Sequence, residues 1–79
     1  MKAPLPRRKM KCVETRDSSS IARFCYDERG RVLIVEFKHG RVYNYYDVPQ
    51  EVFEQMITAP SKGRFFLENI REEYDYTQV

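Results

Sequence analysis

Hydrophobic and polar positions alternate along residues 31–46 with the two-residue period of β-strands. The alternation breaks at residues 38–40, which predicts a hairpin with a three-residue turn. Gly40 is expected to be left-handed there, since only glycine adopts that conformation without strain. This turn pairs Tyr43 with Val35 and Tyr45 with Leu33. The register gathers the large apolar side chains on one face: Leu33, Val35, Phe37, Tyr43 and Tyr45.

The preceding residues 21–26 predict a first strand, and residues 27–30 have the acid-first, glycine-last pattern of a turn. A loop of those four residues pairs Tyr26 with Arg31 and Phe24 with Leu33, which adds Phe24 to the apolar face. The opposite face is half apolar, so we expect a tail or a partner to cover it. Its members are Arg23, Cys25, Val32, Ile34, Glu36, Val42, Asn44 and Tyr46.

After Tyr46 the period becomes helical, with apolar residues on one side of residues 50–57: Val52, Phe53, Met56 and Ile57. Pro49 suits the first turn, and Asp47 with Gln50 has the spacing of a capping box. Residues 59–60 end this helix, and Ser61 is expected to cap a second helix that contributes Phe65, Phe66 and Ile70. The predicted fold class is α+β: a three-stranded antiparallel β-meander followed by two short α-helices packed on one face.

Charge divides the chain into two parts. Residues 1–17 hold six Lys or Arg and two acids, whereas residues 18–79 hold eight Lys or Arg and ten acids. We therefore expect a disordered basic leader over 1–17 and a single domain over 18–79. The leader is either a solvated tail or an arm that contacts phosphates.

The sequence gives little indication of a catalytic site, a bound cofactor or a membrane span. Cys12 and Cys25 fit neither a disulfide framework nor a metal spacing, and Cys25 is predicted to be a free, buried or half-buried thiol. These thiols favour a cytoplasmic protein. The only histidine, His39, lies in the hairpin turn, and the longest apolar run is residues 32–35. We expect no enzyme, no metal or other cofactor, no small-molecule substrate and no membrane span.

From Ser20 onward the chain resembles the KTSC domain family, which is named after the C-terminus of some lysyl-tRNA synthetases and also occurs as small bacterial proteins. The resemblance covers about sixty residues and rests on the order and spacing of several motifs. They are Ser20-Ile21, Tyr26-Asp27, Leu33-x-Val35-x-Phe37-x-x-Gly40, Tyr43-x-Tyr45, Val48-Pro49, Phe53, Ala59-x-Ser61-x-Gly63-x-x-Phe66, Ile70 and Tyr74. Pro60 and the acidic Glu72-Glu73 depart from the family pattern, and the second departure weakens a nucleic-acid surface near the C-terminus.

The synthetase context of the family implies RNA binding, so the first hypothesis is a non-catalytic RNA-binding module. Aromatic rings stack bases and basic side chains contact phosphates. The candidate residues are Arg23, Lys38, Arg41, Tyr43, Tyr45, Tyr46, Lys62 and Arg64. Tyr43 and Tyr45 are also natural core residues, which makes Tyr46 on the other face the better stacking candidate. The alternative is a protein-interaction or homo-oligomerisation module that uses the half-apolar face or an edge strand.

Overall fold

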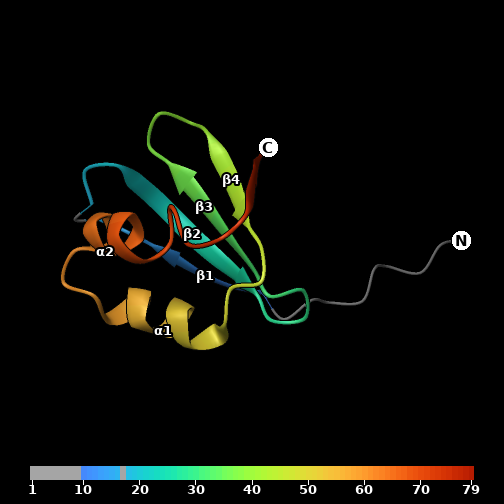
Figure 1. The fold of residues 1–79 in the computed structure, drawn as a ribbon. Coiled ribbons are helices and arrows are strands. Elements are labelled where there is room, and N and C mark those ends of the chain that lie inside the picture. Colours follow the sequence, from blue (N-terminus) through green and yellow to red (C-terminus); the bar gives the residue numbers. More distant parts are fainter. Residues whose placement is uncertain (1–9, 17) are drawn as a thin grey trace, which may run out of the picture.

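Residues 10–16 and 18–79, which the computed structural model describes, form five strands and two helices. The elements are β1 (Met10–Glu14), β2 (Ile21–Asp27), β3 (Val32–Phe37), β4 (Val42–Tyr45), α1 (Gln50–Thr58), α2 (Lys62–Asn69) and β5 (Tyr76–Gln78). The strands form one antiparallel sheet in the order β1-β2-β3-β4-β5, and both helices lie on one side of it (Figure 1). The α+β class is therefore confirmed, but the predicted number of three strands is wrong.

The two strands that the sequence pattern missed are the edges of the sheet. In β1, Val13 pairs with Phe24 of β2, and in β5, Tyr76 pairs with Tyr45 of β4. β1 falls within the segment predicted to be a disordered leader. Residues 1–9 and 17 lie outside the described residues, so disorder of the leader stays a prediction.

The hairpin of β3 and β4 has the predicted register. Leu33 pairs with Tyr45 and Val35 with Tyr43. The Phe37 N–H donates to the Arg41 carbonyl, and the Gly40 N–H donates to the Phe37 carbonyl, both at 2.9 Å. Gly40 has a φ of 101°, as the three-residue turn requires.

The turn between β2 and β3 differs from the prediction by two residues. Tyr26 pairs with Leu33 and Phe24 with Val35, because Asp27 belongs to the strand and its carboxylate organises the turn. Asp27 Oδ1 accepts hydrogen bonds from the N–H groups of residues 29 and 30, at 3.1 and 3.4 Å. A shift of two residues leaves every side chain on its predicted face, since strands alternate with a period of two.

Both helices form close to their predicted positions. Ser61 caps α2, and its Oγ accepts from the Arg64 N–H at 3.2 Å. The predicted capping box at α1 is absent: no side chain caps this helix, and Asp47 has a φ of 58°. Ile57 was predicted to be a core residue but is 36% exposed, because Phe53 and Met56 already occupy the buried side of α1.

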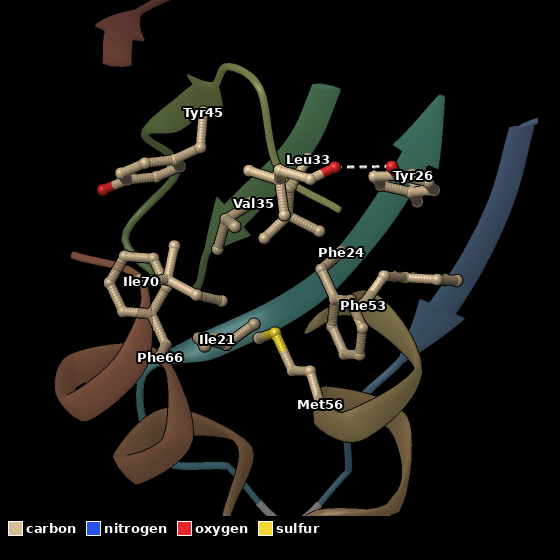
Figure 2. Close-up of a cluster of buried hydrophobic side chains, with 11 residues drawn as sticks. Ile21, Phe24, Tyr26, Leu33, Val35, Tyr45, Phe53, Met56, Phe66 and Ile70 are labelled. Carbon is tan, nitrogen blue, oxygen red and sulfur yellow. Dashed lines mark hydrogen bonds between the residues drawn. The ribbon is translucent and has the colours of Figure 1, made fainter. Parts of the chain in front are cut away.

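The core lies between the helices and the face of the sheet that they cover, which we call the inner face. Figure 2 shows Phe53 and Met56 of α1 and Phe66 of α2 directed toward Phe24 and Val35 of the sheet. Ile21 and Phe24 of β2 are three residues apart and would lie on opposite faces of a regular strand. Both point to the inner face because a bulge interrupts β2 between residues 21 and 23. The Tyr26 hydroxyl donates to the buried Val48 carbonyl, which satisfies both polar groups.

Cys12 and Cys25 form a disulfide, so the prediction of a free Cys25 thiol is wrong. The two residues pair across β1 and β2 with their Cα atoms 4.0 Å apart. The sequence pattern could not predict the bond because it did not predict β1. The disulfide lies on the outer face, opposite the helices, where Cys25 pairs with Ile34.

Candidate functional site

A groove of about 950 Å³ opens on the inner face beside α2. This volume is within the range of small-ligand sites, about 300–1,000 Å³. Residues from β3, β4, α2, the C-terminal segment and two loops line it, and six of the thirteen are phenylalanine or tyrosine. We call it the aromatic groove; its lining residues are Ser20, Phe37, His39, Tyr43, Tyr45, Gly63, Phe66, Leu67, Arg71, Glu72, Tyr74, Asp75 and Tyr76.

The aromatic rings of the groove form a continuous array. The Tyr43 ring lies 5.6 Å from that of Phe37 and 5.6 Å from that of Tyr76, centroid to centroid. The Tyr45 ring lies 5.3 Å from Phe66 and 5.4 Å from Tyr76. Tyr45 is buried, Tyr43 is half-buried and Tyr76 is 55% exposed, so the array runs from the core to the surface.

Gly63 lets the start of α2 approach the segment that precedes β2. A Cβ at Gly63 would lie 3.2 Å from the Ser20 Oγ, so glycine permits this close approach. Phe66 in α2 and Ile70 after it are both buried in the core. The segment after the helix returns to pair Tyr76 with Tyr45, and Tyr76 remains 55% exposed at the groove.

Burial and nearby ionisable groups change the pKa of the Tyr45 hydroxyl, which lies in the groove. Burial, together with the neighbouring Tyr76 and Tyr43 hydroxyls, raises the pKa of Tyr45 to about 12. The Arg71 guanidinium acts in the opposite sense and lowers this pKa. Arg71 and Tyr45 both line the groove, and the raised pKa keeps the Tyr45 hydroxyl a neutral hydrogen-bonding group at neutral pH.

Basic residues lie near the groove residues His39 and Gly63 along the chain, in the β3–β4 turn and at the start of α2. The Lys38 N–H donates to the Ser20 carbonyl at 2.8 Å, and Gly63 lies against Ser18 and Ser20, so the β3–β4 turn and the start of α2 meet there. Arg16 and Lys62 line a second depression, together with the carboxylate-bearing Glu14. We call the basic residues of the β3–β4 turn, the start of α2 and this depression the basic end; they are Arg16, Lys38, His39, Arg41, Lys62 and Arg64.

The basic side chains differ in their availability. Lys38 and Arg41 are exposed and form no ion pair within the described residues. The Lys62 Nζ donates to the Ala59 carbonyl at 3.0 Å, and the Arg64 Nε lies 3.1 Å from a Glu68 carboxylate oxygen. The turn therefore carries the cations that are free to contact a ligand.

The eight residues predicted to bind RNA do not form one surface. Tyr43 and Tyr45 lie in the groove, and four basic residues lie at the basic end: Lys38, Arg41, Lys62 and Arg64. Arg23 lies on the outer face, where its Nε is 3.3 Å from a Glu36 carboxylate oxygen. Tyr46 also lies on the outer face and shares a 2.7 Å hydrogen bond with the Thr77 hydroxyl. The alternation of strand side chains separates these two residues from the groove.

The sequence pattern missed the C-terminal part of the groove. Arg71, Tyr74, Asp75 and Tyr76 line it, but none of them was predicted as a site residue. The aromatic residues at 74 and 76 have the spacing of a strand, which was the available signal. Three residues are too few for this alternation to be recognised without knowledge of a partner strand.

The outer face carries apolar side chains that the helices do not cover. Ile34, Val42 and Tyr46 are half-buried there, next to the disulfide and the Arg23–Glu36 ion pair. The prediction of a half-apolar second face is therefore correct for the described residues.

Residues 10–16 and 18–79 contain neither a metal-binding cluster nor a membrane-spanning helix. These residues contain no group of three or more His, Cys, Asp or Glu side chains arranged to hold a metal ion. None of their helices is long and apolar enough to cross a membrane.

The sequence and the fold of this chain are similar to those of known proteins. The model of the KTSC domain matches residues 17–74. A protein named lysine–tRNA ligase from Nostoc punctiforme is 36% identical over 63 residues, which are 80% of this chain but 11% of the ligase. An uncharacterised protein from Stutzerimonas stutzeri is 36% identical over 63 residues and 89% of its own length. The crystal structure of a KTSC domain protein from Yersinia pestis has a TM-score of 0.80 and 31% identity, over 89% of this chain and 97% of that one.

Proposed function

Because the chain belongs to the KTSC domain family, we propose that it is a binding module for single-stranded RNA, without catalytic activity of its own. Several relatives are named lysine–tRNA ligase, which makes RNA the natural class of ligand. The chain spans about a tenth of the length of those ligases, so we propose only an accessory role and not aminoacylation. We expect this role in the cytoplasm, where tRNA is charged.

One observation carries the proposal: aromatic rings line an open groove, and the same lining includes His39 of the β3–β4 turn and Gly63 of α2, whose neighbours in the chain are Lys38, Lys62 and Arg64. A base that stacks on an aromatic side chain gains about 1–3 kcal/mol. Lys38 and Arg41 would contact the phosphates next to such a base, since both are exposed and lie within two residues of the groove residue His39. The same arrangement of stacking platform and cations is general in proteins that bind single strands.

The histidine of the groove supports binding rather than proton transfer. The Nδ1 of His39 accepts a hydrogen bond from the Arg41 N–H at 3.2 Å, and its ring stacks on Phe37 with centroids 5.5 Å apart. This side chain therefore stabilises the turn. No other titratable group of the groove is paired with it as an acid–base partner would be.

The test is fluorescence anisotropy with a labelled single-stranded RNA at a series of salt concentrations. We expect binding at low salt that weakens steeply as salt rises. Lys38→Ala and Arg41→Ala should each weaken binding and reduce the slope of log K against log salt by about 1. Arg29→Ala is the matched control, because Arg29 is an exposed arginine in the turn at the opposite end of β3. Absence of binding at low salt, or an equal effect of all three substitutions, would contradict the proposal.

The basic leader needs its own control. Substituting Lys2, Arg7, Arg8 and Lys9 by alanine in the full chain removes four positive charges at positions outside the described residues. We expect weaker binding with the effects of Lys38→Ala and Arg41→Ala retained. If the leader variant binds no RNA while Lys38→Ala and Arg41→Ala in the unaltered chain bind normally, the leader is the binding element and the groove is not.

A second candidate function is interaction with a protein partner or with a second copy through the outer face. It is favoured by the half-buried apolar side chains that no described helix covers, Ile34 among them. Sedimentation velocity over a range of concentrations tests self-association. We expect Ile34→Glu to abolish any association through this face, and a strict monomer at high concentration would argue against a second copy.

A further inference from the structure

Two large apolar side chains of the aromatic groove are more than half exposed: Leu67 of α2 and Tyr76 of β5, each at 55%. By contrast, Tyr45 and Phe66 of the same groove are 3% and 4% exposed. Exposed apolar surface at a groove is where a ligand gains most by excluding water. Of the two exposed side chains only Tyr76 has an aromatic face, on which any base can stack.

The Tyr76 ring is held in place by two other rings. Its centroid lies 5.4 Å from that of Tyr45, with 34° between the ring planes, and 5.6 Å from that of Tyr43, with 56° between the planes. Tyr76 pairs with Tyr45 across β4 and β5, so both side chains lie on the inner face. A side chain that its neighbours already order loses little conformational entropy when a ligand stacks on it.

Contacts of the adjacent residues fix β5 on either side of Tyr76. The Tyr46 N–H donates to the Asp75 carbonyl at 2.9 Å. The next side chain, Thr77, lies on the outer face, where its hydroxyl shares the 2.7 Å hydrogen bond with the Tyr46 hydroxyl. These contacts use the main chain and the outer face, so they leave the Tyr76 ring accessible on the inner face.

The tyrosines that the sequence suggested for stacking offer less surface to a base. Tyr45 is buried. Tyr43 is half-buried, and its ring has those of Phe37 and Tyr76 beside it. Tyr46 lies on the outer face, away from the groove. Within the groove, Tyr43 and Tyr45 therefore support the exposed ring and do not replace it.

We propose that Tyr76 is the residue of the groove on which one base of a single-stranded RNA stacks, and that Tyr43 and Tyr45 are positioning residues that hold its ring. This inference rests on the proposed binding of RNA and names the side chain that contacts the base. Stacking on one ring reads no base edge, so the site accepts any base, with an affinity set by stacking strength.

The test uses two labelled oligomers of five ribose phosphates, one with a single adenine on the central sugar and one without any base. Fluorescence anisotropy at low salt measures the affinity of the full chain for each. Both oligomers carry the same phosphates, so the ratio of the two affinities reports the contribution of the base alone. We expect the adenine to tighten binding by at least about fivefold.

Tyr76→Phe keeps the ring and should keep this ratio, whereas Tyr76→Leu keeps an apolar side chain without the ring and should bring the ratio close to unity. Neither substitution removes a charge, so the slope of log K against log salt should not change. Tyr46→Leu is the matched control. It makes the same substitution on the outer face and removes the hydrogen bond with Thr77, so it shows what a more loosely held β5 costs, and it should keep the ratio.

A fluorescence measurement decides the case in which Tyr76→Leu does not fold. The chain has no tryptophan, so Tyr76→Trp and Tyr46→Trp each introduce a single reporter, one in the groove and one on the outer face. A base that stacks on the indole quenches its emission. We expect only the adenine oligomer to quench Tyr76→Trp and neither oligomer to quench Tyr46→Trp. Absence of quenching in Tyr76→Trp overturns the inference.

The outcomes separate the two proposals. If neither oligomer binds at low salt, the proposed RNA binding fails, and the inference fails with it. If both oligomers bind the unaltered protein equally, RNA binding through the phosphates stands and the stacking site is overturned. Retention of the adenine effect in Tyr76→Leu, or its equal loss in Tyr46→Leu, also overturns stacking on Tyr76, because the base then depends on another ring or on the docking of β5.

Discussion

Gly40 shows how one residue fixes the geometry of the site. Its φ of 101° closes the three-residue turn that sets Tyr43 opposite Val35 and Tyr45 opposite Leu33. A register displaced by one residue would turn both tyrosines to the outer face, and the aromatic groove would not form. The conformation of a residue without a side chain therefore decides where the aromatic rings lie.

Gly40→Ala should lower the free energy of unfolding by about 1–2 kcal/mol, the typical cost of a left-handed conformation for an L-residue. No atom lies within 4 Å of the added Cβ, so the cost comes from the backbone alone. Urea denaturation measures it, with Lys38→Ala as the control, because that side chain is exposed and should change stability by less than about 0.5 kcal/mol. Equal stability of the glycine and alanine proteins would contradict the assigned conformation.

Tyr45 should make the protein sensitive to alkaline pH. Its pKa is about 12 in the folded protein and near 10.0 in the unfolded chain, so only the unfolded chain loses this proton between those values. The stability contributed by the protonated hydroxyl is therefore fully present below pH 10 and is lost as pH rises toward 12.

The measurement is the urea midpoint of the unaltered protein and of Tyr45→Phe at increasing pH. We expect the midpoint of the unaltered protein to fall more steeply above pH 10. A smaller slope should remain in Tyr45→Phe, because burial also raises the pKa of Tyr26. Parallel curves for the two proteins would rule out the buried hydroxyl as the cause.

Among the elements, the two edge strands are short and depend on different additional contacts. β1 presents one apolar residue, Val13, to the core and is joined to β2 by the Cys12–Cys25 disulfide. The Thr15 hydroxyl beyond its end donates to the Ile21 carbonyl. β5 has no disulfide. It is held to β4 by backbone pairing between the two strands and by the ring contacts of Tyr76.

Reduction of the disulfide should destabilise the protein by about 3 kcal/mol, the value for a closed loop of about this length, since the cysteines are 13 residues apart. The effect should be greatest in β1, whose amides are expected to lose protection from hydrogen exchange first. The cytoplasm keeps most thiols reduced, so this reduced form would be the relevant one there. Unchanged protection of β1 after reduction would show that the strand pairing alone holds it.

For the molecule as a whole, a single core connects the sheet to both helices. Nine side chains in it are less than 2% exposed, and they come from β2, β3, α1 and the segments that follow β4 and α2. A chain of this size has a small margin of stability. Loss of one large core side chain should therefore weaken every element together.

Leu33→Ala should cost about 2–5 kcal/mol, because Leu33 is fully buried between the strands and the helices. Ile34→Ala is the control: Ile34 is the next residue but lies half-buried on the outer face, so its loss should be smaller. Far-ultraviolet and tyrosine near-ultraviolet circular dichroism should report the same transition. Separate transitions would indicate that the helices and the sheet unfold independently.

The sequence predicts the central part of this fold because its signals are local. Gly40 and the alternating residues around it are sufficient for the hairpin, and Ser61 is sufficient for the start of α2. β1 and β5 could not be predicted in the same way, since the residues around Val13 and Tyr76 are recognisable as strands only when the strand that each pairs with is known. The disulfide and the C-terminal part of the groove depend on those strands, so Cys12 and Tyr76 were missed with them.

The order of the strands also bears on how the protein folds. β1 to β4 pair only with neighbours in sequence, so these hairpins close short loops, whereas β5 must return to β4 across both helices. Closing that longer loop carries a larger entropic cost. We therefore expect β5 to join the sheet last in refolding, so that Tyr76 completes the groove only after the helices have docked. A folding intermediate would then lack affinity for the ligand, and recovery of binding would lag behind recovery of helix in a stopped-flow experiment.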